Sequence, residues 1–313
     1  MKRHKICKII FAILAVFLCV AFYELIGICI TYKKQPAVSD ATIKETQNIM
    51  SVAGRENTER AVIIEKNSQA LLERVRLIQN AKNEIILSTF AFKSDESGKL
   101  ILGALHDAAD RGVHVRILVD GMESWIDMEG NPYFYGLSSH ENVEIKLYNK
   151  ANPLKPWKTM GRMHDKYLIA DGKIYILGGR NTYNYFLGDF PGHKNFDRDV
   201  LVVCDEPQKD NSVNQLWNYF ETIWEQEDCR YFHNSKKLAD RQSVKKAVLE
   251  LQEGYQQYFE VNKEKICDTD YADETFETEK IILLSNPIHT QAKEPVVWYQ
   301  PVSYTHLRAH ETL

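Results

Sequence analysis

Residues 84–120 constrain the fold most, because their pattern indicates a strand, a helix and a second strand in direct succession. Residues 84–92 and 113–120 are short apolar runs typical of buried strands, and residues 98–111 between them are typical of a helix. The apolar residues at helical spacing are Leu100, Ile101, Leu105 and Ala108. Two strands joined through a helix run parallel. We therefore predict an α/β fold with a mixed, largely parallel sheet flanked by helices, and a long ordered loop at 121–141.

The first 31 residues are predicted to be a transmembrane anchor. Residues 9–30 contain only one charge, Glu24, and a helix of that length spans a bilayer core of about 30 Å. Basic residues are more frequent before this run than after it, which favours a cytoplasmic N-terminus and an extracytoplasmic main domain. Two alternatives are a cleaved signal peptide and a buried core helix.

Changes in composition divide the rest of the chain. Residues 32–58 are polar and suit a spacer, and the regular α/β pattern extends over 59–228. Residues 229–278 are more charged and favour a helical connector. Residues 279–300 begin like another copy of the domain, with an apolar strand before a polar turn. Residues 301–313 lack core periodicity and are interpreted as a non-native read-through tail.

Composition limits the kinds of chemistry and partner. The 313 residues carry a formal net charge of −4, which argues against a protein that coats nucleic acid, so no nucleic-acid partner is expected. The six cysteines form no CxxC pair and no cluster with histidine at zinc spacing. We therefore predict no metal site and no cofactor.

Residues 161–181, with the sequence GRMHDKYLIADGKIYILGGRN, carry the most informative pattern. Asp171 and Gly172 are a strong signal for a two-residue hairpin turn between two strands. The pairs expected across this turn are Ala170–Lys173, Lys166–Leu177, His164–Gly179 and Arg162–Asn181. This register gathers the histidine, lysine and asparagine on one face, and Gly179 would leave room there for a substrate.

The residue types on this face suit a phosphate site. A neutral imidazole at His164 can attack phosphorus, the ammonium of Lys166 balances phosphoryl oxygens, and the amide of Asn181 donates a hydrogen bond to them. Asp171 lies in the turn. It either fixes the hairpin through local hydrogen bonds or orients a catalytic group.

The pattern His164-x-Lys166-x4-Asp171, followed by a glycine pair and Asn181, resembles the HxKxxxxD signature of the phospholipase D superfamily. The resemblance covers about residues 60–227. It implies a cardiolipin synthase or phospholipase D-like enzyme that acts on anionic phospholipid at a membrane, with water or an alcohol as acceptor. It also implies a phosphohistidine intermediate. By this resemblance His164, Lys166 and Asp171 are catalytic, and Lys166, Gly179 and Asn181 bind the phosphate.

The superfamily pairs two such motifs, and this sequence has no second HxK. Truncation of a longer enzyme is the favoured explanation, and a homodimer that contributes one motif from each chain is the alternative. The chain alone is then predicted to be inactive. Two other functions stay open: a dimeric nuclease of the same superfamily, and a catalytically silent, membrane-tethered scaffold.

Overall fold

The computed structural model describes residues 2–33, 59–150, 152, 154–156, 161–204, 206, 211–278, 281, 283 and 285. Almost all of the predicted spacer at 32–58 lies outside these residues. The predicted read-through tail at 301–313 and nearly all of the predicted second copy at 279–300 also lie outside them.

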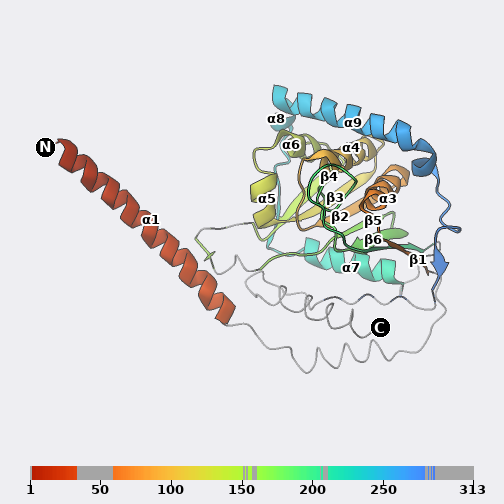
Figure 1. Cartoon of the computed structure of the whole chain (residues 1–313), viewed down its shortest axis with the longest axis horizontal. Helices are drawn as coiled ribbons and strands as arrows, with labels where there is room; N and C mark the ends of the chain where they lie inside the picture. Colours follow the sequence, from red (N-terminus) through yellow and green to blue (C-terminus); the bar gives the residue numbers. More distant parts are fainter. Residues whose placement is uncertain are drawn as a thin grey trace.

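The N-terminal segment is one continuous helix, α1 (Lys2–Lys33). Within it, His4–Gly27 is long and apolar enough to cross a membrane, with a mean hydropathy of 2.7, and none of it is buried against the rest of the chain. Figure 1 shows α1 extending away from the body of the molecule. The helix is consistent with the predicted membrane anchor.

A nine-stranded sheet forms the centre of the body, in the order β8-β4-β3-β2-β5-β6-β7-β1-β9. The strands are β1 (Glu59–Ile64), β2 (Glu84–Thr89), β3 (His114–Asp120), β4 (Val143–Tyr148), β5 (Tyr167–Ala170), β6 (Ile174–Gly178), β7 (Asp199–Cys204), β8 (Cys229–Tyr231) and β9 (Phe276–Glu277). The predicted mixed α/β sheet is confirmed. Among the described strands, β2–β3 and β3–β4 pair in parallel, and every other neighbouring pair is antiparallel. The expectation that the sheet is largely parallel was therefore wrong, because the hairpin β5–β6 and strand β7 join the sheet without helical crossovers.

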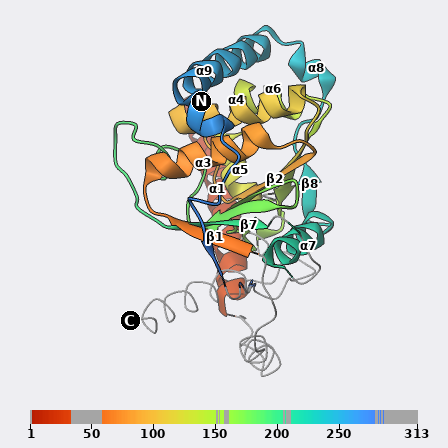
Figure 2. The same ribbon diagram turned by 90° about the vertical axis from the view of Figure 1, so that its right-hand side faces the viewer.

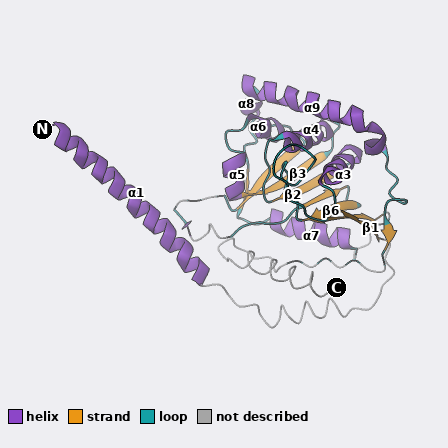
Figure 3. Ribbon diagram, in the orientation of Figure 1, coloured by secondary structure: helices purple, strands orange, loops and turns teal. Residues whose placement is uncertain are grey.

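Helices cover both faces of the sheet. They are α3 (Asn67–Asn80), α4 (Glu96–Asp110), α5 (Gly121–Asp127), α6 (Pro132–Ser138), α7 (Ser212–Trp224), α8 (Lys236–Ala239) and α9 (Gln242–Cys267). Figures 2 and 3 show α3, α4, α6 and α9 on one side of the strands and α7 on the other. The sheet is thus the middle layer of a three-layer fold.

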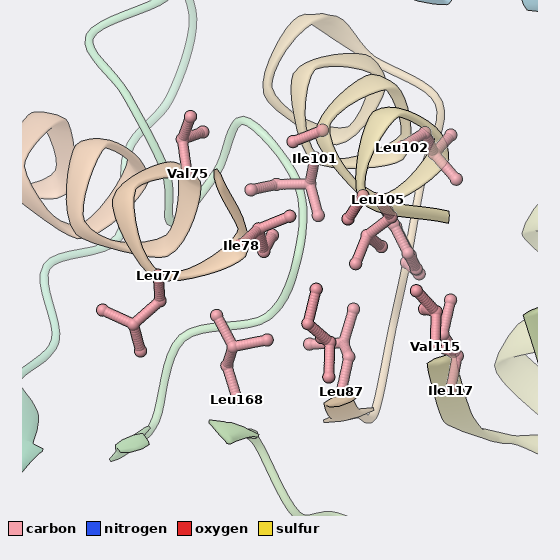
Figure 4. Packing of buried hydrophobic residues seen from close by; sticks show 14 of the residues in the cluster. Val75, Leu77, Ile78, Leu87, Ile101, Leu102, Leu105, Val115, Ile117 and Leu168 are labelled. Carbon is pink, nitrogen blue, oxygen red and sulfur yellow. The ribbon is translucent and has the colours of Figure 1, made fainter. Parts of the chain in front are cut away.

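Two hydrophobic clusters fill the spaces between these layers. Figure 4 shows the larger one, in which side chains from α3 and α4 meet the facing side of the strands. Its members include Val75, Leu77, Ile78, Leu87, Ile101, Leu102, Leu105, Val115, Ile117 and Leu168. The smaller cluster packs Leu216 and Phe220 of α7 against Ile86, Tyr175 and Val202 of the strands. Because both faces are covered, the central strands β2 and β3 are buried along almost their whole length.

The segment 121–141 is not the predicted long loop, since it contains the short helices α5 and α6. The side chain of Asp120 accepts hydrogen bonds from the first turn of α5, and Asn131 caps α6 in the same way. Pro132 occupies the first turn of α6, where its missing N–H costs nothing. Asp120, Asn131 and Pro132 are typical helix-start residues, and they were the sequence signal for these two helices.

The predicted helical connector at 229–278 contains α8 and α9. Helix α9 buries Val244, Leu251 and Tyr255, which belong to the larger hydrophobic cluster. It packs on Gly103 of α4, where an added Cβ would lie 2.6 Å from the carbonyl oxygen of Leu251. This stretch therefore contributes to the helical layer over the sheet and, through β8 and β9, to the two edges of the sheet.

Candidate active site

Except for Asp171, the predicted site residues gather where the parallel strands end. Strand β2 ends at Thr89 and β3 ends at Asp120, and the segment with His164 and Lys166 directly precedes β5. Strand β5 lies antiparallel to β2, with Tyr167 beside Ser88. The carboxyl ends of parallel strands are the common position of ligand sites in α/β sheets.

The hairpin that positions these residues has the predicted turn but not the predicted register. Asp171 and Gly172 have φ values of 53° and 63°, as a two-residue hairpin turn of this kind requires. Ala170, however, pairs with Ile174, so the predicted register was wrong by one residue. Lys173 is the additional residue, because its carbonyl oxygen accepts a hydrogen bond from the backbone N–H of Cys204 in β7, at 2.8 Å.

The shift changes which residues lie opposite one another. Gly178 donates its backbone N–H to the carbonyl oxygen of Lys166, at 3.2 Å, so Lys166 faces Gly178 instead of Leu177. The predicted pairing of His164 with Gly179 is therefore not formed. The two key side chains still converge, through a residue that the sequence pattern did not identify.

That residue is Phe90, which follows β2 directly. The His164 ring meets the Phe90 ring edge to face, with 4.7 Å between the centroids. The ammonium of Lys166 lies 5.3 Å from the same centroid, and the guanidinium carbon of Arg162 lies 4.9 Å from it. Phe90 thus fixes the spacing of three cationic or titratable groups. The one sequence signal that Phe90 belongs to the site was its position directly after the buried strand β2.

The surroundings of His164 keep its imidazole neutral. Partial burial, with smaller contributions from the positive charges of Lys166 and Arg162, lowers the pKa of His164 to about 4. The side chain is nevertheless exposed at the surface, where a substrate can reach it. A neutral, accessible imidazole has the lone pair that a nucleophile needs.

Lys166 is buried, with 5% of its surface exposed. Burial lowers its pKa to about 8, against the opposing effect of Asp165, Asp197 and Asp120. Its ammonium also donates to the carbonyl oxygen of His164, which ties the two residues together. Lys166 therefore stays largely protonated near pH 7 and can balance negative charge beside the imidazole.

Asp165, between these two residues, points to the other face of the segment. Its Oδ2 accepts a hydrogen bond from the hydroxyl of Tyr219 in α7, at 2.8 Å. Burial raises the pKa of the Asp165 carboxyl, while the Tyr219 hydrogen bond and the charge of Lys166 act in the opposite direction. The sequence pattern did not identify this pair.

Asn181 follows β6, the second strand of the hairpin, and is buried, with 7% of its surface exposed. Its side-chain oxygen accepts a hydrogen bond from the backbone N–H of Ala91, at 3.1 Å. This contact leaves the NH2 end of the amide as the group that could donate to a phosphoryl oxygen. Asn181 is thereby held next to the segment that contains Phe90.

Arg162 is held by acidic side chains at the end of β3. Its Nε donates to Asp120 at 2.9 Å, and a terminal nitrogen donates to Glu123, also at 2.9 Å. Asp120 is fully buried, and burial raises its pKa, while Arg162 acts in the opposite direction. Asp120 also accepts the backbone N–H of Met163, at 3.0 Å. It therefore positions the two residues that precede His164.

Gly178 and Gly179 make room for carboxylates. A Cβ on Gly179 would lie 2.0 Å from Oδ2 of Asp197, and a Cβ on Gly178 would lie 2.0 Å from Oδ1 of Asp199. The space that was predicted for a substrate at Gly179 is thus occupied by the Asp197 side chain. Asp199 forms a buried ion pair with Arg74, at 2.9 Å, beneath the site.

Asp171 lies at the opposite end of β5 from His164. Its carboxylate accepts the backbone N–H groups of Lys82, Asn83 and Glu84, at 2.7 to 2.9 Å. These residues lead into β2. The contacts favour the first of the two predicted roles, which is to fix the hairpin against the neighbouring strand.

Among the described residues, no group of three or more His, Cys, Asp or Glu side chains is placed to hold a metal ion. A cavity of 1040 Å³ is lined mainly by residues of β1, α3 and α9. None of the predicted site residues lines it. The candidate site instead lies at the ends of the central strands β2, β3 and β5, where His164 is exposed.

Comparison with known proteins identifies related sequences over this part of the chain. A family model described as cardiolipin synthase, PLD-like domain, matches residues 75–224. An uncharacterized protein of Helicobacter pylori is 33% identical over 181 residues, which cover 53% of this chain and 35% of that protein. Cardiolipin synthase C of Escherichia coli is 29% identical over 154 residues, which cover 45% of this chain and 31% of the synthase. The chain thus spans about a third of the length of these relatives.

Phosphatidylserine synthase of Haemophilus influenzae aligns with 70% of this chain and 48% of its own, at 15% identity and a TM-score of 0.48.

Proposed function

We propose that this chain, which belongs to the phospholipase D superfamily, supplies one half of an active site for phosphodiester transfer on phospholipids. The observation that carries the proposal is the convergence of His164 and Lys166 on Phe90, with the imidazole neutral and the amine largely protonated. The cardiolipin synthase relatives favour a phospholipid over other diesters as the substrate.

In this proposal the neutral imidazole of His164 attacks the phosphorus atom. A P–N bond forms, the P–O bond to the leaving alcohol breaks, and Lys166 and the amide of Asn181 stabilise the charge on the phosphoryl oxygens. Water or an alcohol then attacks the phosphohistidine and releases His164. The low pKa of His164 favours this role over that of proton donor, because an imidazole with a pKa of about 4 is almost entirely unprotonated at neutral pH.

The leaving alcohol needs a proton, which we assign to a second motif of the same kind. That motif comes from a continuation of the chain or from a second subunit. His164 is exposed at the ends of the central strands, where such a partner could face it. A second half would also remove water from the surroundings of the phosphohistidine.

The test is to trap the phosphohistidine. The full chain is reconstituted in vesicles that contain phosphatidylglycerol with a labelled phosphate, and acid-labile label on the protein is measured together with the released lipid products. At protein densities that let two copies of the chain meet and complete the site, we expect label on the wild type and its loss in His164→Ala, while Lys173→Ala, which changes an exposed lysine of the same hairpin, keeps the wild-type level.

Several outcomes would contradict the proposal. Lipid turnover that persists in His164→Ala would exclude His164 as the nucleophile. Turnover of an oligonucleotide without turnover of lipid would favour the nuclease alternative. An absence of label on both substrates, at protein densities that allow two copies to meet, would favour a chain that completes no site by itself or a silent scaffold.

A further inference from the structure

Three large apolar side chains are exposed beside the candidate site. Trp125 and Ile126 are 60% and 65% exposed near the end of α5, and Leu154 is 79% exposed in the loop that follows β4. Single exposed apolar residues are common on protein surfaces. The position of these three, near one another and near the site, is what needs a physical explanation.

The first residue of helix α5 packs against the first residues of the loop at 149–161. The backbone of Gly121 packs so closely that an added Cβ would lie 2.6 Å from atoms of Tyr148, Asn149 and Lys150. The side chain of Asn149 donates to the carbonyl oxygen of Gly161, at 2.7 Å, which brings the two ends of the loop together. The start of α5, the helix that carries Trp125, therefore packs against the start of the loop that contains Leu154.

The start of α5 also adjoins the candidate site. Asp120, which caps α5, holds the side chain of Arg162 and the backbone of Met163. His164 follows directly in the chain. The start of α5 thus borders the site, and we call Trp125, Ile126 and Leu154, which α5 and the adjoining loop carry, the rim of the site.

The charges around this rim suit an anionic surface. The acidic side chains of α5 and the following turn each have a partner: Glu123 pairs with Arg162, Asp127 pairs with Lys93, and Oε1 of Glu129 lies 2.6 Å from Nε2 of His233. Lys150 and Lys155 are exposed in the adjoining loop. Lysines that flank a tryptophan and aliphatic side chains are typical of segments that lie in the interface of a membrane.

A contact between the rim and the apolar helix α1 indicates that this anionic surface is a membrane. The hydroxyl of Tyr23, in the last part of the membrane-spanning stretch His4–Gly27, donates to the carbonyl oxygen of Leu154, at 3.1 Å. Tyrosine is enriched where a membrane helix leaves the hydrocarbon. Figure 1 shows α5 at the edge of the body on the side of α1.

We infer that Trp125, Ile126 and Leu154 insert into the headgroup region of the bilayer that holds α1. The lysines then lie at the level of the lipid phosphates, and the candidate site opens along the membrane surface. The inference deepens the proposed function, since it states how the site would reach a lipid phosphodiester. It requires an inserted α1 and does not require turnover.

Photocrosslinking of the full chain tests this inference. The chain is reconstituted in vesicles of phosphatidylethanolamine and phosphatidylglycerol, with benzoylphenylalanine in place of Trp125, Ile126 or Leu154, one position at a time. Matched controls are Leu249 and Val261 of α9, which are 58% and 84% exposed. A position within α1, Leu14, serves as the inserted reference. Lipid adducts on the labelled peptides are measured by mass spectrometry.

We expect adducts at the three rim positions to exceed those at the α9 controls about tenfold, since an interfacial segment sits about 5–10 Å into the headgroup boundary. Rim adducts no more frequent than those on α9, with Leu14 labelled, would overturn the inference. Crosslinks from the rim to a second polypeptide in place of lipid would also overturn it. The pattern should be the same in a His164→Ala background, so failure of the proposed function and failure of membrane docking are separate outcomes.

Discussion

The hydroxyl of Tyr219 donates a hydrogen bond to the carboxylate of Asp165, with 2.8 Å between the two oxygens. Asp165 separates His164 from Lys166, and Tyr219 lies 54 residues further along the chain, in α7. The bond therefore ties the segment with the proposed nucleophile to the helix on the opposite face of the sheet. Helix α7 contributes to the geometry of the site without supplying a reacting group.

Tyr219→Phe tests the energetic importance of this bond. The substitution keeps the ring and leaves the buried Asp165 carboxyl without its donor, so we expect the free energy of unfolding to fall by about 1–3 kcal/mol. The measurement is denaturant unfolding of the full chain in detergent, followed by tryptophan fluorescence. Tyr231→Phe, at a tyrosine that is 52% exposed, is the control and should change stability little. Equal losses in the two variants would contradict the prediction.

The low pKa of His164 gives a prediction about pH. Diethylpyrocarbonate acylates neutral imidazole, and a histidine with an ordinary pKa of about 6.5 should react about 25-fold more slowly at pH 5 than at pH 7. Because the pKa of His164 is lowered to about 4, its neutral form persists at pH 5, and its rate should change little over this range. The rates are followed by mass spectrometry of the labelled peptide, with N-acetylhistidine as the reference. A drop as large as that of the reference would show that the pKa is not lowered.

The motif and the turn could be predicted from sequence because both depend on local chemistry. Asp171 and Gly172 accept positive φ values readily, and the structure has them there. The register could not be predicted in the same way. It depends on the bond between Lys173 and Cys204, and Cys204 belongs to a strand that is distant in sequence. A pairing rule for the two strands of a hairpin does not take account of hydrogen bonds to a third strand.

The surroundings of the motif were missed for a similar reason. Phe90, Asp120 and Tyr219 belong to three separate elements, and only the folded sheet brings them to His164 and Lys166. Two of them had a usable signal, since Phe90 and Asp120 stand at the ends of adjacent parallel strands. The convergence of such strand ends is a general property of α/β sheets. Applied to 84–120, it would have placed both residues beside the motif.

The two neighbouring glycines should differ in their tolerance of a methyl group. At Gly178 the new Cβ would lie 2.6 Å from the backbone oxygen of Arg198 as well as against Asp199, and neither backbone can move freely. At Gly179 the nearest atoms belong to the side chain of Asp197, which can rotate. We expect Gly178→Ala to cost about 2–3 kcal/mol and Gly179→Ala less than about 1 kcal/mol. Denaturant unfolding of the two variants checks the order, and a reversed order would contradict it.

Asp171 provides the sharpest separation of a structural from a catalytic role within the motif. Its carboxylate accepts three backbone N–H groups, and its φ is 53°. Asp171→Asn keeps an acceptor oxygen and a side chain that tolerates this φ, Asp171→Gly keeps only the tolerance, and Asp171→Ala loses both. We expect losses in the free energy of unfolding that rise in that order, from about 1 kcal/mol to about 3 kcal/mol. Since five residues of extended chain, about 17 Å, separate Asp171 from Lys166, the folded fraction of each variant should form phosphohistidine at the wild-type rate. A rate that falls in Asp171→Asn while stability is retained would instead assign Asp171 to the chemical step.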